Sequence, residues 1–374
     1  MALMDKPEVI KKVHAFMRNV RKNGNRIGKT PRSLTLNYNN LCNFKCDFCF
    51  SSEPNNEHLK AALSFDTIKD IADQAHELGI WEIVLTGGEL TVNKPKLLEL
   101  IKAFGPERFQ MILITNGYLL TQEYADDLAK AGLDCIAVSI SGMDAKEHDE
   151  SRHVPGAHAH ALKALEYAQK SGMAAWPNVI FGHHNAFSED LIAMLEYAKE
   201  HKYSTYFMMA MPFGSFKDSV MDAKDMQRLN WIRKNYDCFF DTWDMYDRKK
   251  EAITGCWTVN RTYVSPLGDV FVCPYIPIAI GNILKQSLKE ILDYGFSIKY
   301  FGGYSPVCIS AHNKQFRQKF LADETKNVFN PIFATEIFEK EDYEEGVVPA
   351  PRKTVNFVKE EGGIVGGHLF SGRP

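Results

Sequence analysis

The chain has 374 residues, enough for a barrel-sized domain and a smaller one. Its formal net charge is −3, so charge alone gives no reason to expect nucleic-acid or membrane partners. No run reaches the roughly 20 apolar residues of a transmembrane helix, and the N-terminus lacks the apolar core of a secretory signal. We therefore expect a cytoplasmic protein, whose eight cysteines serve a purpose other than disulfide formation.

Residues 1–33 are predicted to form a short amphipathic helix and a basic linker. Ile10, Val13, Phe16 and Met17 recur at helical spacing, and nine residues of the segment are Lys or Arg. A solvated helix face is the commoner reason for such a charge run. Contact with an anionic substrate or partner is the alternative.

From residue 34 the pattern alternates between strand and helix. Strands are predicted at 34–38, 82–86, 111–115, 135–140, 176–181 and 205–211. Helices are predicted at 65–78, 95–104, 122–131, 157–171, 188–200 and 225–235. This alternation predicts an α/β fold with a parallel sheet and helical crossovers, in which functional residues follow the C-terminal ends of the strands.

Three cysteines, Cys42, Cys46 and Cys49, lie within eight residues just after the first predicted strand. Soft thiolates suit zinc or an iron–sulfur cluster. A structural zinc site has four ligands, usually in C-x2-C pairs, whereas the spacing here is C-x3-C-x2-C with no fourth cysteine nearby. Three thiolates on a cubane leave one iron without a protein ligand, and the amino and carboxylate groups of S-adenosylmethionine (SAM) suit that position.

With Phe48 before its third cysteine, this loop resembles the signature of the radical SAM superfamily. Gly87, Gly88 and Glu89 end the second predicted strand and are similar to the family's GGE motif, which holds the SAM amino group. A strand-ending glycine turn is the alternative. The resemblance implies a partial (β/α)6 TIM-like barrel, a [4Fe–4S] cluster, and cleavage of SAM to a 5′-deoxyadenosyl radical that abstracts hydrogen from substrate. Reducing flavodoxin or ferredoxin would supply the electron.

Three further stretches extend the resemblance. Asn116 lies in a Thr-Asn-Gly run after the third predicted strand, and Ser139 ends the fourth. The family often has Ser-x-Asp-Gly at the latter position, so Ser141 departs from the pattern by lacking a carboxylate. Arg152 closes an H-D-x-x-R run and could pair with the SAM carboxylate, a surface salt bridge being the alternative. The resemblance implies that Asn116, Ser139 and Arg152 bind SAM.

A second set of cysteines lies downstream. Cys256 and Cys273 flank Gly268 as C-x11-G-x4-C, which resembles the start of a SPASM or shorter Twitch domain, with Cys308 as a third ligand. No C-x2-C run follows Cys308, so the resemblance implies one auxiliary cluster, of the [4Fe–4S] type, rather than two. Its fourth ligand stays open. The candidates are Cys238, His312, Cys135 or no protein ligand.

Two isolated cysteines are candidates for catalysis. Cys135 shares strand parity with Ser139, so its thiol is predicted to face the barrel interior, where it could donate hydrogen to a substrate radical. Cys238 lies among aromatic residues and could be a hydrogen donor or a ligand. Core packing is the more common role for both.

The predicted division of the chain has four parts: 1–33, helix and basic linker; 34–238, radical SAM barrel; 239–320, Twitch-like auxiliary domain; 321–374, C-terminal extension. We expect a radical SAM enzyme acting on a natural-product-type small molecule or a peptide. Dehydrogenation, epimerisation, cross-linking and rearrangement all remain open. An iron–sulfur electron-transfer or cluster-carrier protein without SAM chemistry is the alternative, and a structural zinc protein a further one.

Overall fold

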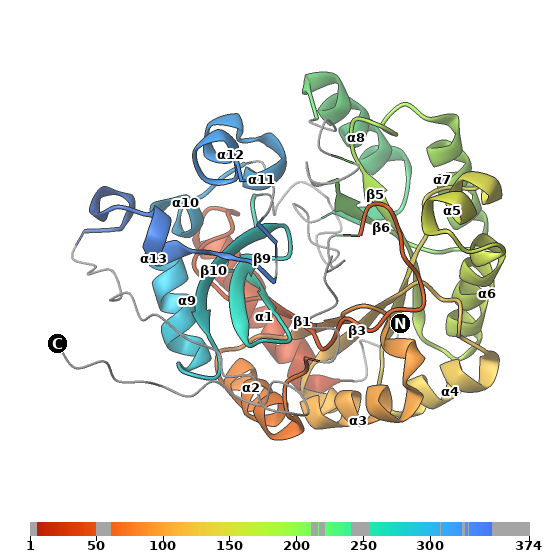
Figure 1. Cartoon of the computed structure of the whole chain (residues 1–374), viewed down its shortest axis with the longest axis horizontal. Coiled ribbons are helices and arrows are strands. Elements are labelled where there is room, and N and C mark those ends of the chain that lie inside the picture. Colours follow the sequence, from red (N-terminus) through yellow and green to blue (C-terminus); the bar gives the residue numbers. More distant parts are fainter. Residues whose placement is uncertain are drawn as a thin grey trace.

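Parallel strands curl around a common axis, with helices packed on the outside (Figure 1). The computed structural model describes residues 6–49, 61–210, 216, 221–240, 255–306, 308–323, 326, 327 and 329–345. The strands are β1 (Ser33–Asn37), β2 (Glu82–Thr86), β3 (Gln110–Thr115), β4 (Cys135–Ser139), β5 (Ala174–Phe181), β6 (Thr205–Met209), β7 (Cys238–Phe240), β8 (Arg261–Val264), β9 (Asp269–Cys273), β10 (Ile276–Asn282) and β11 (Ile332–Phe333). They form one 11-stranded sheet in the order β11-β10-β9-β8-β1-β2-β3-β4-β5-β6-β7.

The helices follow the strands in the order expected for βα units. They are α1 (Pro7–Lys22), α2 (Phe65–Glu77), α3 (Lys94–Phe104), α4 (Gln122–Lys130), α5 (Ala145–Arg152), α6 (Ala157–Lys170), α7 (Glu189–Glu200), α8 (Ala223–Asn235), α9 (Leu288–Ser297), α10 (Lys299–Gly302), α11 (Ile309–His312), α12 (Lys314–Phe320) and α13 (Ala334–Ile337). Side-chain caps fix several starts. For example, the Ser64 hydroxyl accepts a hydrogen bond from the Thr67 amide at the start of α2.

The two faces of the barrel strands carry different residues. In β1, Leu34 and Leu36 belong to the large core between strands and helices, so the alternating Thr35 and Asn37 face the interior. A smaller apolar cluster fills part of the interior. Its fully and partly buried members include Val84, Ile112, Ile114, Cys135, Ala137, Trp176, Tyr206, Met208 and Phe239.

Helix α1 closes the end of the barrel where the strands begin. Its apolar face packs on Trp81, which directly precedes β2, and on Trp257, which lies four residues before β8. The Lys6 ammonium donates to the carbonyls of Phe109 and Gly132, both just before strands, and pairs with Asp134 at 2.5 Å. The opposite, C-terminal end of the strands is thereby left for the loops that carry the motifs.

The α/β class, the parallel sheet and the barrel are confirmed, and structural differences are local. Helix α5 was not predicted, because its sequence is almost entirely polar and has no apolar stripe. Strand β7 was also missed. It pairs in parallel with β6 and so belongs to the barrel sheet, although the predicted boundary between the barrel and the auxiliary domain falls after its first residue, Cys238. The predicted strand 205–211 ends at Met209, and residue 211 lies outside the described part of the chain.

The predicted auxiliary region continues the same sheet. Strand β8 pairs in parallel with β1, and β9 and β10 follow as antiparallel neighbours. Tyr343 of the predicted C-terminal extension packs against Tyr294 of α9, with their hydroxyls 2.8 Å apart. No helix of the described residues is long and apolar enough to cross a membrane.

Candidate active site

The loop after β1 carries the first three cysteines. Cys42 and Cys49 are exposed and Cys46 is partly buried. The amide of Phe44 donates to Cys42 Sγ at 3.3 Å, and the amide of Cys49 to the Cys46 carbonyl at 3.3 Å, so the loop coils and brings the thiols together. Burial raises the pKa of Cys46 to about 11, while the nearby Arg152 guanidinium acts in the opposite direction. Three converging thiols beside one cation fit a three-ligand iron–sulfur cluster.

The glycines after β2 let this loop and the cysteine loop touch. A Cβ on Gly87 would lie 2.4 Å from the Asn39 carbonyl oxygen, and one on Gly88 would lie 2.3 Å from that of Leu41. The amides of Gly88 and Glu89 donate to the same two carbonyls at 2.7 Å. In the structure these two glycines therefore admit the backbone of the cysteine loop.

Glu89 is buried and joins the ends of two strands. Its Oε1 accepts from the amide and hydroxyl of Thr91 and from the Thr115 hydroxyl, and its Oε2 accepts from the Asn116 amide at 2.7 Å. Burial raises the pKa of Glu89, and these hydrogen bonds oppose the rise. A carboxylate offers about four acceptor positions, so Oε2 keeps room for one more donor, such as an ammonium.

Asn116 connects this network to the cysteines. Its side-chain amide donates to Asn43 Oδ1 at 2.9 Å, and its own Oδ1 accepts from the Tyr118 amide. Asn43 lies between Cys42 and Cys46 in the chain. The structure therefore brings Gly87, Gly88, Glu89 and Asn116 to the cysteine loop at the C-terminal edge of the sheet, where Ser139 also ends β4.

Arg152 lies at the same edge and is buried. Its Nη1 donates to the Ser141 hydroxyl at 2.8 Å, and its guanidinium lies 5.1 Å from the centre of the Phe48 ring. Burial lowers the pKa of Arg152 to about 10, and the Cys46 thiolate opposes that shift. Ser141, where the family often has a carboxylate, thus accepts a hydrogen bond from Arg152 without neutralising its charge.

The other two polar residues of the H-D-x-x-R run hold the local fold. Burial and the Arg152 charge lower the pKa of His148 to about 3, so its neutral ring can accept from the Ser141 amide at 3.3 Å. The Asp149 carboxylate accepts from the amides of Gly156 and His158 at the start of α6. Both residues thereby fix the position of Arg152.

The second cysteine set also converges. The thiols of Cys256 and Cys308 lie close together, and their interaction lowers the pKa of Cys256 and raises that of Cys308. Cys273 is close enough to raise the pKa of Cys256 by its charge. Gly268, with φ +83°, forms the turn between β8 and β9 that returns Cys273 toward Cys256. This grouping of three buried or half-buried thiols fits an auxiliary cluster.

The two cysteine sets lie toward opposite ends of the barrel. The first follows the C-terminal end of β1. Strand β8 runs parallel to β1, and β9 runs antiparallel to β8, with Phe271 of β9 opposite Tyr263 of β8. Cys273 ends β9, two residues beyond Phe271. Cys273 therefore lies toward the end where β1 begins, and the barrel interior separates the two sets.

Three candidates for a fourth auxiliary ligand have different surroundings. Cys238 packs in the outer core with Phe240, away from the interior. Cys135 faces the interior as predicted, but it is fully buried in the apolar cluster, where it pairs in register with Ile112 of β3 and Ala174 of β5. His312 is on α11, which begins directly after Cys308, and its Nε2 is buried with no hydrogen-bond partner among the described residues.

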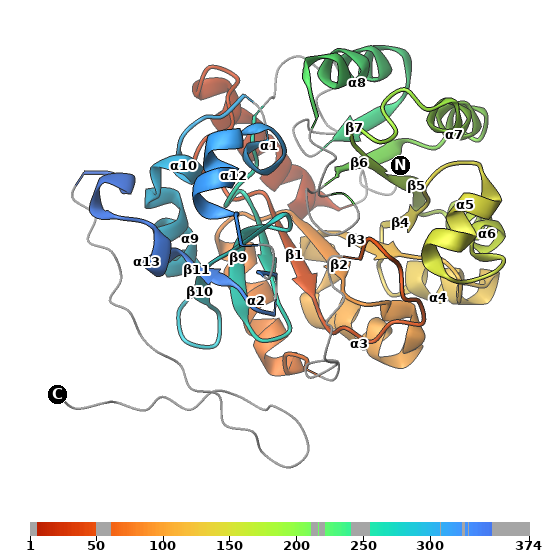
Figure 2. The same ribbon diagram turned by 45° about the horizontal axis from the view of Figure 1, so that its top comes forward.

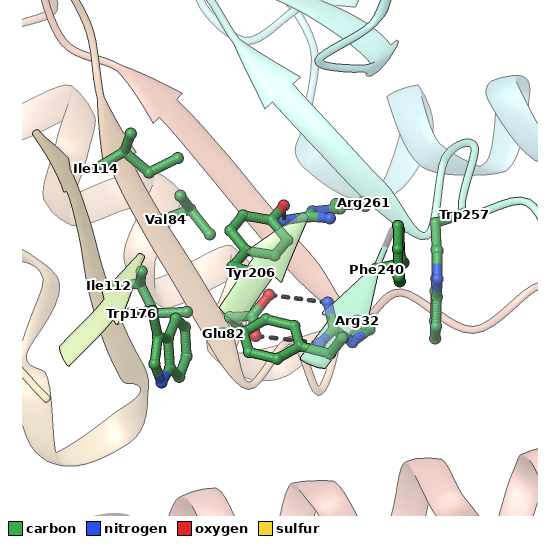
Figure 3. A pocket seen from close by; sticks show the side chains of 11 residues that line it. Arg32, Glu82, Val84, Ile112, Ile114, Trp176, Tyr206, Phe240, Trp257 and Arg261 are labelled. Carbon is green, nitrogen blue, oxygen red and sulfur yellow. Dashed lines mark hydrogen bonds and ion pairs between the residues drawn. The ribbon is translucent and has the colours of Figure 1, made fainter. Parts of the chain in front are cut away.

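Several interior residues were not singled out from the sequence. The floor of the interior is the end at which the strands begin. There Arg32 makes a bidentate ion pair with Glu82 at 2.8 and 3.2 Å, and Arg261 donates a hydrogen bond to the Tyr206 hydroxyl (Figure 3). They line a cavity of about 20 Å³, the space that one water molecule needs. Higher up, Thr35, Asn37 and Asn178 each carry a buried oxygen without a hydrogen-bond partner among the described residues. For Thr35 and Asn37, the alternation of polar and apolar residues along β1 is a sequence signal that they face the interior.

Comparison with known proteins agrees with this geometry. The model of the Radical SAM superfamily matches residues 36–198, and the SPASM model, described as an iron–sulfur cluster-binding domain, matches residues 256–310. An AdoMet-dependent heme synthase of Methanosarcina barkeri is 29% identical over 293 residues, which cover 70% of this chain and 82% of the relative. A GTP 3′,8-cyclase of Staphylococcus aureus is 28% identical over 290 residues, covering 69% and 83%.

Solved structures share the fold. Streptococcus suis SuiB bound to precursor peptide SuiA has a TM-score of 0.52 and 18% identity, covering 70% of this chain and 63%, less than two thirds, of its own. Native anSMEcpe with bound AdoMet has a TM-score of 0.55 and 18% identity, covering 70% and 81%. At this identity the likeness concerns architecture alone.

Proposed function

Because the chain belongs to the radical SAM superfamily and carries a SPASM-type auxiliary region, we propose that it activates a substrate held inside the barrel between its two iron–sulfur clusters. The family's cofactors are a [4Fe–4S] cluster, SAM and an auxiliary cluster. When bound, the first cluster and SAM supply a 5′-deoxyadenosyl radical that abstracts hydrogen. One observation carries the proposal: Asn116 donates hydrogen bonds both to the Glu89 carboxylate and to Asn43 of the cysteine loop, and so links Glu89 to that loop.

We assign the SAM-binding roles by charge and remaining hydrogen-bonding capacity. Cys42, Cys46 and Cys49 hold the first cluster. Glu89 Oε2 accepts from the SAM ammonium, and Arg152, which has donors beyond the one given to Ser141, pairs with the SAM carboxylate. Gly87, Gly88, Asn116 and Ser139 complete the cradle at the ends of β2, β3 and β4. Because Ser141 is neutral, its hydrogen bond leaves the positive charge of the Arg152 guanidinium available to the SAM carboxylate.

The substrate is proposed to be a natural-product-type small molecule rather than a peptide. The two relatives described above are named AdoMet-dependent heme synthase and GTP 3′,8-cyclase, and both names denote small-molecule reactions. The unpartnered oxygens of Thr35, Asn37 and Asn178 favour a substrate that presents hydrogen-bond donors, above the aromatic floor of Trp176 and Tyr206. Peptide-bound SuiB has a similar fold, so a peptide is the second candidate.

Cys135 is the better of the two candidates for a hydrogen donor to a substrate radical. Its thiol faces the barrel interior, whereas Cys238 packs among the helices. Full burial in the apolar cluster with Ile112 and Trp176 makes packing the competing role for Cys135. Retention of product stereochemistry in a Cys135→Ala variant would assign it to packing.

Release of 5′-deoxyadenosine tests the function. Protein loaded with iron and sulfide should release it from SAM under anaerobic, reducing conditions. Glu89→Gln is the matched variant, because its amide would set a second donor against the Asn116 amide and the SAM ammonium. We expect it to weaken SAM binding roughly tenfold or more, the cost of a charge-assisted hydrogen bond. Fully loaded protein that releases no 5′-deoxyadenosine with candidate substrates present would disprove the proposal.

His312 is proposed as the fourth ligand of the auxiliary cluster. Its Nδ1 faces the Cys308 carbonyl at 3.3 Å, and its buried Nε2 is left for another partner. In a background lacking Cys42, Cys46 and Cys49, His312→Ala should change the electron paramagnetic resonance signal of the remaining cluster, and His312→Cys should retain its iron. His183→Ala is the control, since His183 bonds Asp225 instead. An unchanged signal in His312→Ala would exclude ligation.

A further inference from the structure

We propose that a basic patch, formed by Arg21, Lys22 and Arg26 around the end of α1, is the docking surface for a small acidic electron-carrier protein that exchanges one electron with the auxiliary cluster. This inference rests on the auxiliary cluster of the proposed function. It adds where, and to what kind of partner, that cluster is connected.

The patch is basic because of how α1 lies on the barrel. Its buried residues, Val9, Val13, Phe16 and Val20, all face the barrel floor. Arg21 and Lys22 are exposed in its last turn, and Arg26 follows in an exposed turn. Among the described residues no carboxylate pairs with Arg21, Lys22 or Arg26. The chain as a whole is slightly acidic, so this local excess of positive charge is a feature of the patch and not of the whole surface.

Arg26 connects the patch to the loop beside an auxiliary cysteine. The Arg26 guanidinium lies 4.9 Å from the centre of the Tyr304 ring, which is 40% exposed. The carbonyl of the next residue, Ser305, accepts a hydrogen bond from the Cys256 amide at 2.8 Å. One surface loop, residues 303–306, therefore separates Arg26 from a proposed cluster ligand. Figure 2 shows α1 and α10, which precedes this loop, on the same side of the molecule.

An aromatic contact makes a second connection. On the inner side of α1, Phe16 stacks on Trp257 with ring centres 6.0 Å apart. Trp257 directly follows Cys256 in the chain. The segment that carries the positive charge is thus packed, through Phe16, on the residue beside a cluster ligand. A protein seated on the patch would approach the auxiliary site through ordered, buried side chains.

The chemistry of the patch selects the partner. Positive charge without paired carboxylates favours an acidic surface, and electrostatic attraction accelerates the encounter of carrier proteins with their partners. One electron leaves the reduced auxiliary cluster and reduces the oxidised carrier. No bond forms or breaks. Because the first cysteine loop lies toward the other end of the barrel, an electron can enter at one end and leave at the other.

Binding of oxidised flavodoxin to the loaded holoprotein is the first test. Calorimetric titration at low ionic strength should show Kd rising about tenfold or more in Arg21→Glu/Lys22→Glu/Arg26→Glu. The matched control, Lys96→Glu/Lys102→Glu/Lys163→Glu, makes the same change in net charge at exposed positions of α3 and α6 and should leave Kd within about twofold. At about 0.5 M salt the difference should shrink, because the Debye length falls below 8 Å.

Electron transfer is the second test and separates this inference from the proposed function. The background is Cys42→Ala/Cys46→Ala/Cys49→Ala, and the prereduced protein is oxidised by flavodoxin in a stopped-flow experiment. Oxidation should slow about tenfold when the three patch residues are changed to Glu, but not when the three control lysines are. Equal binding or equal rates in the two charge variants would overturn the docking surface, as would binding of anionic lipid vesicles but not of flavodoxin. Absence of iron from this background would instead overturn the auxiliary cluster itself.

Discussion

Replacing Cys42, Cys46 and Cys49 by alanine should lower the iron content from about eight to about four per chain, the stoichiometry of two cubanes. It should also reduce 5′-deoxyadenosine release to background. The reason is spatial: these thiols follow the C-terminal end of β1, whereas the neighbouring thiols of Cys256 and Cys308 lie toward the other end of the barrel. Each set can therefore keep its iron without the other. The measurement is iron and sulfide analysis of anaerobically reconstituted protein.

Matched variants sharpen this count. Cys238→Ala should keep about eight irons, because Cys238 packs in the outer core, and a Cys256→Ala/Cys273→Ala/Cys308→Ala chain should keep about four. If the native chain holds about four irons and the first variant none, the auxiliary cysteines are structural. Electron exchange through a second cluster, and with it the docking patch, would then be excluded.

The candidate site could be predicted at one edge of the sheet because parallel βα units bring strand ends together. Cys42, Glu89 and Asn116 were each found in a motif that follows a predicted strand, whereas Arg152 was found only through its H-D-x-x-R run. In the structure Glu89 and Asn116 are hydrogen-bonded. The H-D-x-x-R motif did not indicate which of its residues has which role. His148 and Asp149 look equal to Arg152 in sequence, yet only their hydrogen bonds to backbone amides identify them as residues that position it.

The interior of the barrel was harder to predict. Interior residues come from strands far apart in sequence, so their association depends on strand order and register. Arg32 precedes β1, and its partner Glu82 begins β2. Nothing in either local sequence requires the pair. Strand β7 was hidden for a related reason: it is three residues long and owes its conformation to pairing with β6.

Several parts of the chain meet at the floor of the barrel interior. Arg32 lies between Trp81 and Trp257, at 4.7 and 4.9 Å from their ring centres, and its charge is balanced by Glu82. Trp257 also contacts Phe16 of α1. The ion pair thus joins β1, β2, the auxiliary region and α1 beneath the interior. A disturbance at the floor should reach the auxiliary cysteines through Trp257.

The second large effect follows from this arrangement. Glu82→Ala should lower the free energy of unfolding by about 3–5 kcal/mol, because it leaves the buried Arg32 guanidinium without its counter-charge. The double variant Arg32→Met/Glu82→Leu, which removes both charges and keeps apolar volume, should lie within about 1–2 kcal/mol of the native chain. Denaturant unfolding of the loaded protein, followed by far-UV circular dichroism, measures both.

An exposed ion pair is the control for this measurement. Lys289 and Asp293 pair on the outer face of α9 with both side chains more than 60% exposed, so Asp293→Ala should cost about 0.5 kcal/mol or less. If Glu82→Ala costs no more than Asp293→Ala, water reaches Arg32 and the floor is not sealed by α1. If instead the double variant is as unstable as the single one, shape rather than charge compensation holds the floor. The expected ordering, with only the single buried variant strongly destabilised, would show that α1 closes the barrel over a compensated charge.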